Sequence, residues 1–190
     1  VLNGNTTCLT RNTMIGKLRK EFTFAVKKSG MEITRIFDLL DHLKQNYPSD
    51  AALAGKKNGD WVKYSTREYV KLSKLFGLGL LANGFRKGDK IATVTNNRPE
   101  WNFADMGMLM TGIVHVPIYP TISPDEYRHI LRHSDARAVI ISDKSLYSRL
   151  EEIIRSVESI EKIFTFNELE GVSHWLEIIN LGEANQKQLQ

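Results

Sequence analysis

The spacing of apolar and polar residues changes along the chain, and residues 88–119 give the clearest sequence of elements. Residues 90–95 are rich in β-branched side chains, which predicts a buried strand. Pro99 suits the first turn of a helix, where no backbone N–H is needed, and the segment that follows is apolar on almost every side. Gly112 predicts the end of this helix, and residues 113–116 predict the next strand. The stretch therefore predicts a βαβ unit.

The same alternation continues toward the C-terminus. Ser123 to Glu126 form a capping box that predicts a helix to about His133, and an amphipathic helix is expected from Ser145 onward. Apolar strands are predicted from Arg137 and from Ile160, so that one helix separates each pair of strands. Strands spaced in this way predict an α/β fold, with a parallel sheet built of βαβ units and helices on both faces.

The residues before this unit predict two helices and a hairpin. Asn58-Gly59 predicts a hairpin turn between short strands at residues 51–54 and 61–64. Ser65 opens a capping box, and the helix that follows should end at Asn83-Gly84. Three glycines in and after this helix loosely resemble a dinucleotide-binding fingerprint, namely Gly77, Gly79 and Gly84. That fingerprint is excluded, because its glycines must lie between a strand and the start of a helix.

An amphipathic helix is predicted from Ile36 to the residue before Pro48. Its apolar face consists of Ile36, Leu39, Leu40, Leu43 and Tyr47. This face could bind a partner or a membrane surface, or it could pack on the domain. The polar side is mixed in charge rather than basic, so we expect packing on the domain. From residue 167 to 190 the chain becomes polar, and we expect a linker there.

Charge is concentrated at the N-terminus. Of the net charge of +4, residues 1–30 contribute six basic residues and one acid, or +5, which leaves −1 for the remainder. A nearly neutral body argues against a dedicated nucleic-acid surface. The basic leader, residues 1–30, could be a targeting segment, an ordered arm or translated sequence upstream of a start at Met31; we favour the last and expect residues 31–190 to form the fold.

Length and composition exclude several classes of protein. A chain of 190 residues with 42% hydrophobic and 25% charged residues is typical of one globular domain. Cys8 is the only cysteine, so no disulfide can form within the chain, which fits a reducing compartment. No run is long and apolar enough to span a membrane. We therefore expect a cytoplasmic protein, and leave peripheral membrane association and homodimer formation open.

Three side-chain patterns invite a chemical interpretation, and each has a simpler structural one. Asp143 follows a strand as the phospho-acceptor of a receiver domain would, but helix capping is favoured, because a receiver needs acidic Mg²⁺ ligands after an earlier strand, and that strand ends in Thr95-Asn96-Asn97. Glu126, His129 and His133 could present metal ligands on one helix face, yet a solvated face is favoured. His115 lies between valines on a strand, which favours a packed, hydrogen-bonded side chain over a catalytic base.

Met106, Met108 and Met110 could line an acyl tunnel, but core filling is the better interpretation. The sequence contains neither the G-x-S-x-G nucleophile motif nor a Walker A loop.

Four segments, in order, carry a family resemblance. They are W-V-K-Y-S-T-R-E-Y, G-D-K-I-A-T-V-T-N-N-R-P-E-W, G-I-V-H-V-P-I-Y-P-T and A-R-A-V-I-I-S-D-K-S. They resemble the early core segments of the adenylate-forming (AMP-binding) enzymes, in particular the long-chain fatty acid:CoA ligases (acyl-CoA synthetases). The resemblance covers roughly residues 31–190. It implies the N-terminal part of the large domain of such an enzyme, truncated before its phosphate loop.

The resemblance implies an enzyme that joins a fatty acid to ATP, forming an acyl adenylate, and then transfers the acyl group to coenzyme A. ATP, Mg²⁺ and coenzyme A are implied for the full-length enzyme, and none of them is assigned a site within this chain. The residues that bind them in the family lie further along, so no catalytic, cofactor-binding or metal residue is carried over, and we expect this chain alone to be inactive. The alternative is a stand-alone binding or assembly module without catalysis. Nucleic-acid binding by the basic leader ranks last.

The polar turn after the strand predicted at residues 90–95 is a further candidate for ligand binding. It contains Asn97, Arg98, Pro99, Glu100 and Trp101. Open α/β sheets place ligands at the carboxyl edge of their strands, where this turn should lie. A role in forming the turn and capping the helix is the favoured interpretation.

Overall fold

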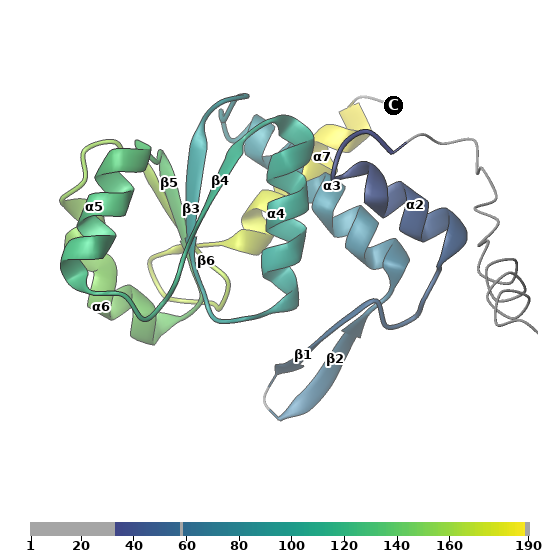
Figure 1. Ribbon diagram of the computed structural model, residues 1–190, viewed down its shortest axis with the longest axis horizontal. Coiled ribbons are helices and arrows are strands. Elements are labelled where there is room, and N and C mark those ends of the chain that lie inside the picture. The colour runs from purple at the N-terminus through teal and green to yellow at the C-terminus, as the bar shows by residue number, and fades with distance from the viewer. Residues whose placement is uncertain (1–32, 58, 189–190) are drawn as a thin grey trace, which may run out of the picture. The chain divides into compact units, whose positions relative to one another are not determined.

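Five parallel strands organise the part of the chain that the computed structural model describes, residues 33–57 and 59–188. The sheet has the order β4-β3-β5-β6-β7, and a separate antiparallel hairpin pairs β1 with β2 (Figure 1). The strands are β1 (Leu53–Lys57), β2 (Asp60–Tyr64), β3 (Lys90–Val94), β4 (Val114–Ile118), β5 (Ala138–Ile141), β6 (Lys162–Thr165) and β7 (Ser173–His174). The helices are α2 (Asp38–Asn46), α3 (Thr66–Ala82), α4 (Pro99–Thr111), α5 (Pro124–Ser134), α6 (Lys144–Arg155) and α7 (Trp175–Gln188).

Alternate residues of the central strands bury their side chains on opposite faces of the sheet. In β5, Ala138 and Ile140 join one hydrophobic cluster, whereas Val139 and Ile141 join another. Helices α3, α4 and α7 supply the first cluster, and α5 and α6 supply the second (Figure 1). The predicted parallel sheet with helices on both faces is confirmed.

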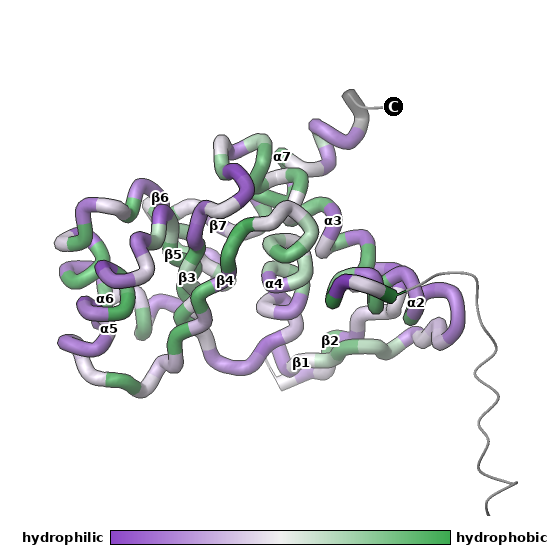
Figure 2. The backbone as a smooth tube through the Cα atoms, turned by 45° about the horizontal axis from the view of Figure 1, so that its top comes forward, coloured by the Kyte–Doolittle hydropathy of each residue, from purple (hydrophilic) through white to green (hydrophobic). Residues whose placement is uncertain are grey.

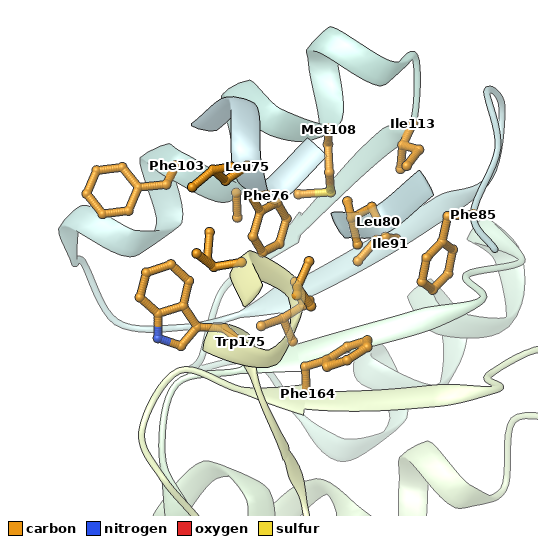
Figure 3. Packing of buried hydrophobic residues seen from close by; sticks show 14 of the residues in the cluster. Leu75, Phe76, Leu80, Phe85, Ile91, Phe103, Met108, Ile113, Phe164 and Trp175 are labelled. Atoms are coloured by element: carbon orange, nitrogen blue, oxygen red, sulfur yellow. The ribbon is translucent and has the colours of Figure 1, made fainter. Parts of the chain in front are cut away.

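The first cluster contains most of the buried aromatic side chains. Figure 3 shows Phe76 and Leu80 of α3 lying between α4 and the sheet, and Trp175 of α7 lies on the side of Phe103. Met108 is completely buried there, and Met106 and Met110 are partly buried against the same cluster. The core-filling interpretation of the three methionines is confirmed.

Glycines let the helices of this layer approach closely. A Cβ added at Gly77 would lie 2.7 Å from the Gly107 carbonyl oxygen, and one at Gly79 would lie 1.8 Å from the Ile178 carbonyl oxygen. Helix α3 is therefore held tightly against α4 on one side and α7 on the other. Gly77 and Gly79 lie within helix α3 rather than between a strand and a helix, so the exclusion of a dinucleotide-binding fingerprint is confirmed for them.

The predicted starts of α3 and α5 and the predicted end of α4 are confirmed by their caps. The Ser65 hydroxyl oxygen accepts a hydrogen bond from the Glu68 backbone N–H at 3.2 Å. In turn, the Glu68 carboxylate accepts one from the Ser65 backbone N–H at 2.7 Å. Ser123 and Glu126 repeat this arrangement at the start of α5. Gly112 ends α4 in the left-handed conformation, with φ of 72°.

One prediction from the sequence is wrong, and a second is confirmed only in part. Residues 175–188 form helix α7 rather than a linker, because Trp175, Ile178 and Ile179 make a helical apolar face that is buried against α3. Helix α2 packs on the domain through Leu40, but the other residues of its predicted apolar face stay exposed. Leu40 is 1% exposed, whereas Ile36 and Tyr47 are 61% and 66% exposed.

The hairpin is confirmed, although its first strand begins later than predicted, at Leu53. The last pair before the turn is Lys57 with Asp60, and Gly59 in the turn has φ of 93°. The predictions for residues 1–30, including Cys8, and for Asn58 fall outside the described residues. Within the described residues, no helix is long and apolar enough to cross a membrane.

Candidate functional site

The carboxyl ends of β3, β5 and β6 meet at one edge of the sheet, and polar residues follow each of them. Asn97 and Arg98 follow β3, Ser142 and Asp143 follow β5, and Asn167 follows β6. Because β3, β5 and β6 are neighbouring parallel strands, the turns that follow them lie at the same edge of the sheet. The sequence predicted this position for the turn after β3. This edge is the candidate site.

Arg98 connects all three turns. Its Nε donates to Glu100 Oε2 at 2.9 Å, and its Nη2 donates to Glu100 Oε1 at 3.1 Å. Its Nη1 donates to the Ser142 carbonyl at 3.2 Å and to Asn167 Oδ1 at 3.1 Å. The guanidinium also lies over the Phe166 ring, 4.9 Å from the centroid. Arg98 therefore uses its donors inside the protein and fixes the turn after β3 to the ends of β5 and β6.

The two carboxylates at this edge are held in their charged forms. Burial by itself would raise the pKa of Glu100, but hydrogen bonds from Arg98 and its positive charge outweigh burial and hold that pKa below its ordinary value. Burial opposes ionisation of Asp143 too, but hydrogen bonds from the Ser142 hydroxyl and the Leu146 N–H lower its pKa. Asp143 caps α6 through the latter bond, which confirms the capping interpretation.

Pro99 is the first residue of α4, as predicted, and it is buried beneath the hairpin. A Cβ added at Gly55 of β1 would lie 2.7 Å from Pro99 Cδ, so the hairpin contacts the start of α4 closely. Asn97 is exposed. For Arg98, Pro99 and Glu100, the geometry matches the turn-and-cap role.

A second polar network lies beside this edge, between β3, β4 and α4. His115 Nδ1 lies 2.7 Å from Asp105 Oδ1, and His115 Nε2 lies 2.8 Å from Thr93 Oγ1. Trp101 Nε1 donates to the same Thr93 oxygen at 3.2 Å. A carboxylate only accepts, so the bond to Asp105 places a proton on His115 Nδ1, and His115 Nε2 shares the second hydrogen bond with Thr93 Oγ1. Every polar atom of this chain of hydrogen bonds is thereby satisfied.

The order carboxylate, imidazole, hydroxyl is also that of a catalytic triad, but burial argues against catalysis here. Thr93 is 1% exposed, and its oxygen already accepts from Trp101, so a substrate carbon has no approach to it. The expectation that His115 is packed and hydrogen-bonded is confirmed. Sequence reasoning missed Thr93 and Asp105, because their relation to His115 depends on strand pairing and on how α4 crosses the sheet.

The metal-ligand pattern on α5 is not assembled into a site. Glu126 accepts from the Ser123 N–H at 2.8 Å and the Ser123 hydroxyl at 2.7 Å, so its carboxylate serves the cap. The His129 and His133 rings lie 5.6 Å apart on the exposed face. Across residues 33–57 and 59–188, no group of three or more His, Cys, Asp or Glu side chains is placed to hold a metal ion.

A cleft of about 590 Å³ lies along β6, between α6 and α7. Its charged lining groups already have partners. Glu161 bonds Arg137 at 2.7 Å, Arg155 bonds Glu151 at 2.9 Å, and Lys162 donates to Asn83 Oδ1 at 2.9 Å. The cleft is open and polar, and these charged groups are paired within the protein.

Comparison with known proteins gives these observations a family context. The family described as AMP-binding enzyme matches residues 40–187. A fatty acyl-CoA synthetase A from Dictyostelium discoideum is 26% identical over 171 residues, which cover 81% of this chain and 26% of that protein. The long-chain-fatty-acid–CoA ligase FadD15 of Mycobacterium bovis is 28% identical over 106 residues, covering 56% of this chain and 18% of that protein.

Solved structures share the fold. A long-chain-fatty-acid CoA ligase from Rhodopseudomonas palustris superposes with a TM-score of 0.67 at 17% identity, covering 76% of this chain and 36% of that one. The apo structure of MbtA from Mycobacterium smegmatis also gives 0.67, at 19% identity, and covers 90% of this chain and 30% of that one.

The chain thus spans about a fifth to a quarter of the length of these curated relatives. Since the family match extends over most of the described fold, including the turn built around Arg98, this chain belongs to the AMP-binding enzymes.

Proposed function

We propose that this chain supplies the first part of the large domain of a long-chain fatty acid:CoA ligase. The whole enzyme would join a fatty acid to ATP with Mg²⁺, release pyrophosphate, and pass the acyl group from the adenylate to coenzyme A. Residues 31–190 would form the early core of that domain, ending before the phosphate loop, and residues 1–30 would lie outside the fold. The relatives' names support the substrate class.

In this proposal the described residues contribute structure rather than reacting groups. The observation that carries it is the pairing of charges at the carboxyl edge of the sheet, where Arg98 is occupied by Glu100 and Asn167. A nucleotide site needs free donors for phosphate and oxygen ligands for Mg²⁺. Glu100 and Asp143 are held by partners within the protein, which supports a structural role for these two carboxylates rather than binding of ATP or its metal ion.

Pyrophosphate exchange tests the proposal. Purified chain 1–190 is incubated with ATP, Mg²⁺, labelled pyrophosphate and a long-chain fatty acid, and label entering ATP is measured. The proposal predicts exchange no faster than without the acid. The Dictyostelium fatty acyl-CoA synthetase A serves as the positive control. Acid-dependent exchange by chain 1–190 at a rate near that control would contradict the proposal.

The second candidate is a stand-alone binding or assembly module that keeps the fold without catalysis. What favours it is the packing of α7, whose residues Trp175, Ile178 and Ile179 are buried in the cluster that α3 lines. The size of the native polypeptide distinguishes the two candidates. A native protein that ends at Gln190 would favour the module, and one that continues through a phosphate loop would favour the ligase.

A further inference from the structure

Helix α5 carries two histidines on one exposed face. His129 and His133 are four positions apart, so they lie about 40° apart around the helix axis, one turn above the other. Both residues are exposed, and their ring centroids are 5.6 Å apart with planes inclined by 31°. Figures 1 and 2 place α5 beside α6 at the outer end of the fold, and Figure 2 shows hydrophilic and hydrophobic residues mixed along it. The two imidazoles therefore lie together outside the core.

The other histidines of the chain are used within the protein, and this pair is not. The other three are hydrogen-bonded, His42 to Asn46, His115 to Asp105, and His174 to the Phe166 carbonyl. Across residues 33–57 and 59–188, the side-chain hydrogen bonds of α5 are made by other residues of that helix, and none by His129 or His133. The ring nitrogens of the pair are therefore available to a ligand.

Helix α5 holds the pair on a fixed frame. The capping box of Ser123 and Glu126 fixes its start, and Asp135 ends it in the left-handed conformation with φ of 54°. On the opposite side, Tyr127 and Leu131 are each 1% exposed and belong to the second hydrophobic cluster. Because the backbone between the two histidines is already ordered, only side-chain rotation is lost when both bind one ion.

The charged neighbours of the pair do not exclude a cation. Residues 123–134 hold two acids and two arginines, so this stretch is formally neutral when its histidines are neutral. Arg128 is paired with Asp125, Nη1 to Oδ1 at 2.7 Å. Glu126 serves the helix cap, so the three-residue pattern is not assembled, and the two histidines remain as a chelating pair.

We propose that His129 and His133 together bind one divalent transition-metal ion, Zn²⁺ or Ni²⁺, through one ring nitrogen each. Imidazole is a preferred ligand of these ions, and histidines four positions apart on a helix bind zinc in H-E-x-x-H motifs. With Zn–N bonds of about 2.0–2.1 Å at a tetrahedral angle, two imidazole centroids lie roughly 5 Å apart, close to the separation of this pair.

Water completes the coordination, because the described residues, 33–57 and 59–188, place no group of three or more His, Cys, Asp or Glu side chains for a metal ion. Mg²⁺, the ion of the proposed ligase reaction, prefers oxygen ligands and is not expected here. The proposal rests on α5 alone and is independent of the ligase activity.

Metal titration tests the proposal. The parent protein is chain 1–190 with Cys8→Ser and without a polyhistidine tag, so that no thiolate competes for the ion. Zn²⁺, Ni²⁺ and Mg²⁺ are titrated into it by calorimetry. The matched variant, Arg128→His/His129→Arg, keeps composition and charge but sets the two histidines five positions apart, about 140° around the helix. His133→Ala removes one ligand, and His42→Ala removes a histidine outside the pair. Far-UV circular dichroism checks that each variant is folded.

The parent and His42→Ala should bind one Zn²⁺ or one Ni²⁺ equally well and should not bind Mg²⁺ at this site. The exchange variant and His133→Ala should bind at least about tenfold more weakly, since loss of even an outer-shell partner costs about 10–100-fold in metal affinity. Because the pair is formed only in the folded helix, Zn²⁺ should also raise the urea midpoint of the parent but not of the exchange variant. Equal Zn²⁺ affinity of the parent and either folded pair variant would overturn the proposal, as would a parent that binds neither ion.

Discussion

Arg98 and Glu100 form a two-point ion pair across the first turn of α4, with Nε–Oε2 and Nη2–Oε1 distances of 2.9 and 3.1 Å. Their side chains are 18% and 14% exposed, so the pair is shielded from water on most sides. The same guanidinium reaches the ends of β5 and β6. A residue at the start of one helix thus fixes three strand ends to one another.

Replacing this arginine should destabilise the fold. Arg98→Ala leaves the Glu100 carboxylate without its partner in a largely buried place, and we expect a loss of about 2 kcal/mol in the free energy of unfolding, measured with urea. Arg128→Ala is the matched control, because Arg128 pairs with the 93% exposed Asp125 and should change stability by less than about 0.5 kcal/mol. Equal losses in the two variants would contradict the structural role of Arg98.

Acid should remove part of this stability. Glu100 and Asp143 have pKa values below the ordinary carboxyl values in the folded protein. Their contribution is complete above the unfolded values, about 4, and is lost as the pH falls through the lowered folded values. Glu100→Gln should therefore be less stable at neutral pH and lose less stability than the wild-type chain below about pH 4. If the free energies of unfolding of the two proteins fell equally with decreasing pH, Glu100 would not contribute to the acid dependence.

Thr93 offers a test of the network around His115. Thr93→Val keeps the shape of the side chain but removes the oxygen that Trp101 and His115 contact. Leaving these two buried groups without a partner should cost about 1–3 kcal/mol in urea unfolding. Thr121→Val, at an exposed position, should change stability by no more than about 0.5 kcal/mol. If the two variants were equally stable, the Thr93 hydroxyl would contribute little to the free energy of unfolding.

Gly79 tests the close packing of α3 against α7. Alanine favours a helix by about 1 kcal/mol over glycine, but a Cβ at Gly79 would lie 1.8 Å from the Ile178 carbonyl oxygen. That contact involves backbone and cannot be relieved by a rotamer change, so we expect Gly79→Ala to lose about 3 kcal/mol in thermal or urea unfolding. Gly171→Ala is the control, since Gly171 has φ of 77° and no neighbour within 4 Å, and it should lose only about 1 kcal/mol. A Gly79→Ala chain as stable as the wild type would rule out the tight α3–α7 contact.

The elements with strong local signals could be predicted from the sequence. Ser65, Ser123 and Gly112 mark helix ends by chemistry that involves a few neighbouring residues, and the structure has helix ends at each of them. The strand at Val114–Ile118 extends past the predicted end at residue 116, because Pro117 lies on the edge strand of the sheet. The parallel direction of the strands could be predicted from the regular alternation of strands and helices.

What the sequence could not supply was the outcome of tertiary contacts. The pattern of apolar residues in α2 is that of a packed helix, and only the arrangement of α3 determines that Leu40 is covered while Ile36 is not. Helix α7 was not predicted, because residues 167–190 begin with polar residues. Its apolar face could be recognised only in the structure, where it packs against α3. The partners of Arg98 at Ser142 and Asn167 are far away in sequence, so their meeting depends on the order of the strands.

The intact mass of the native polypeptide, with its N-terminal sequence, tests most directly the claim that this chain is the structural first part of a larger ligase. We predict a mass several times the 21.7 kDa of residues 1–190, with a start at Met31 and sequence continuing through a phosphate loop. A native polypeptide of 21.7 kDa that begins at Val1 and ends at Gln190 would contradict that claim, and the binding-module function would then be favoured.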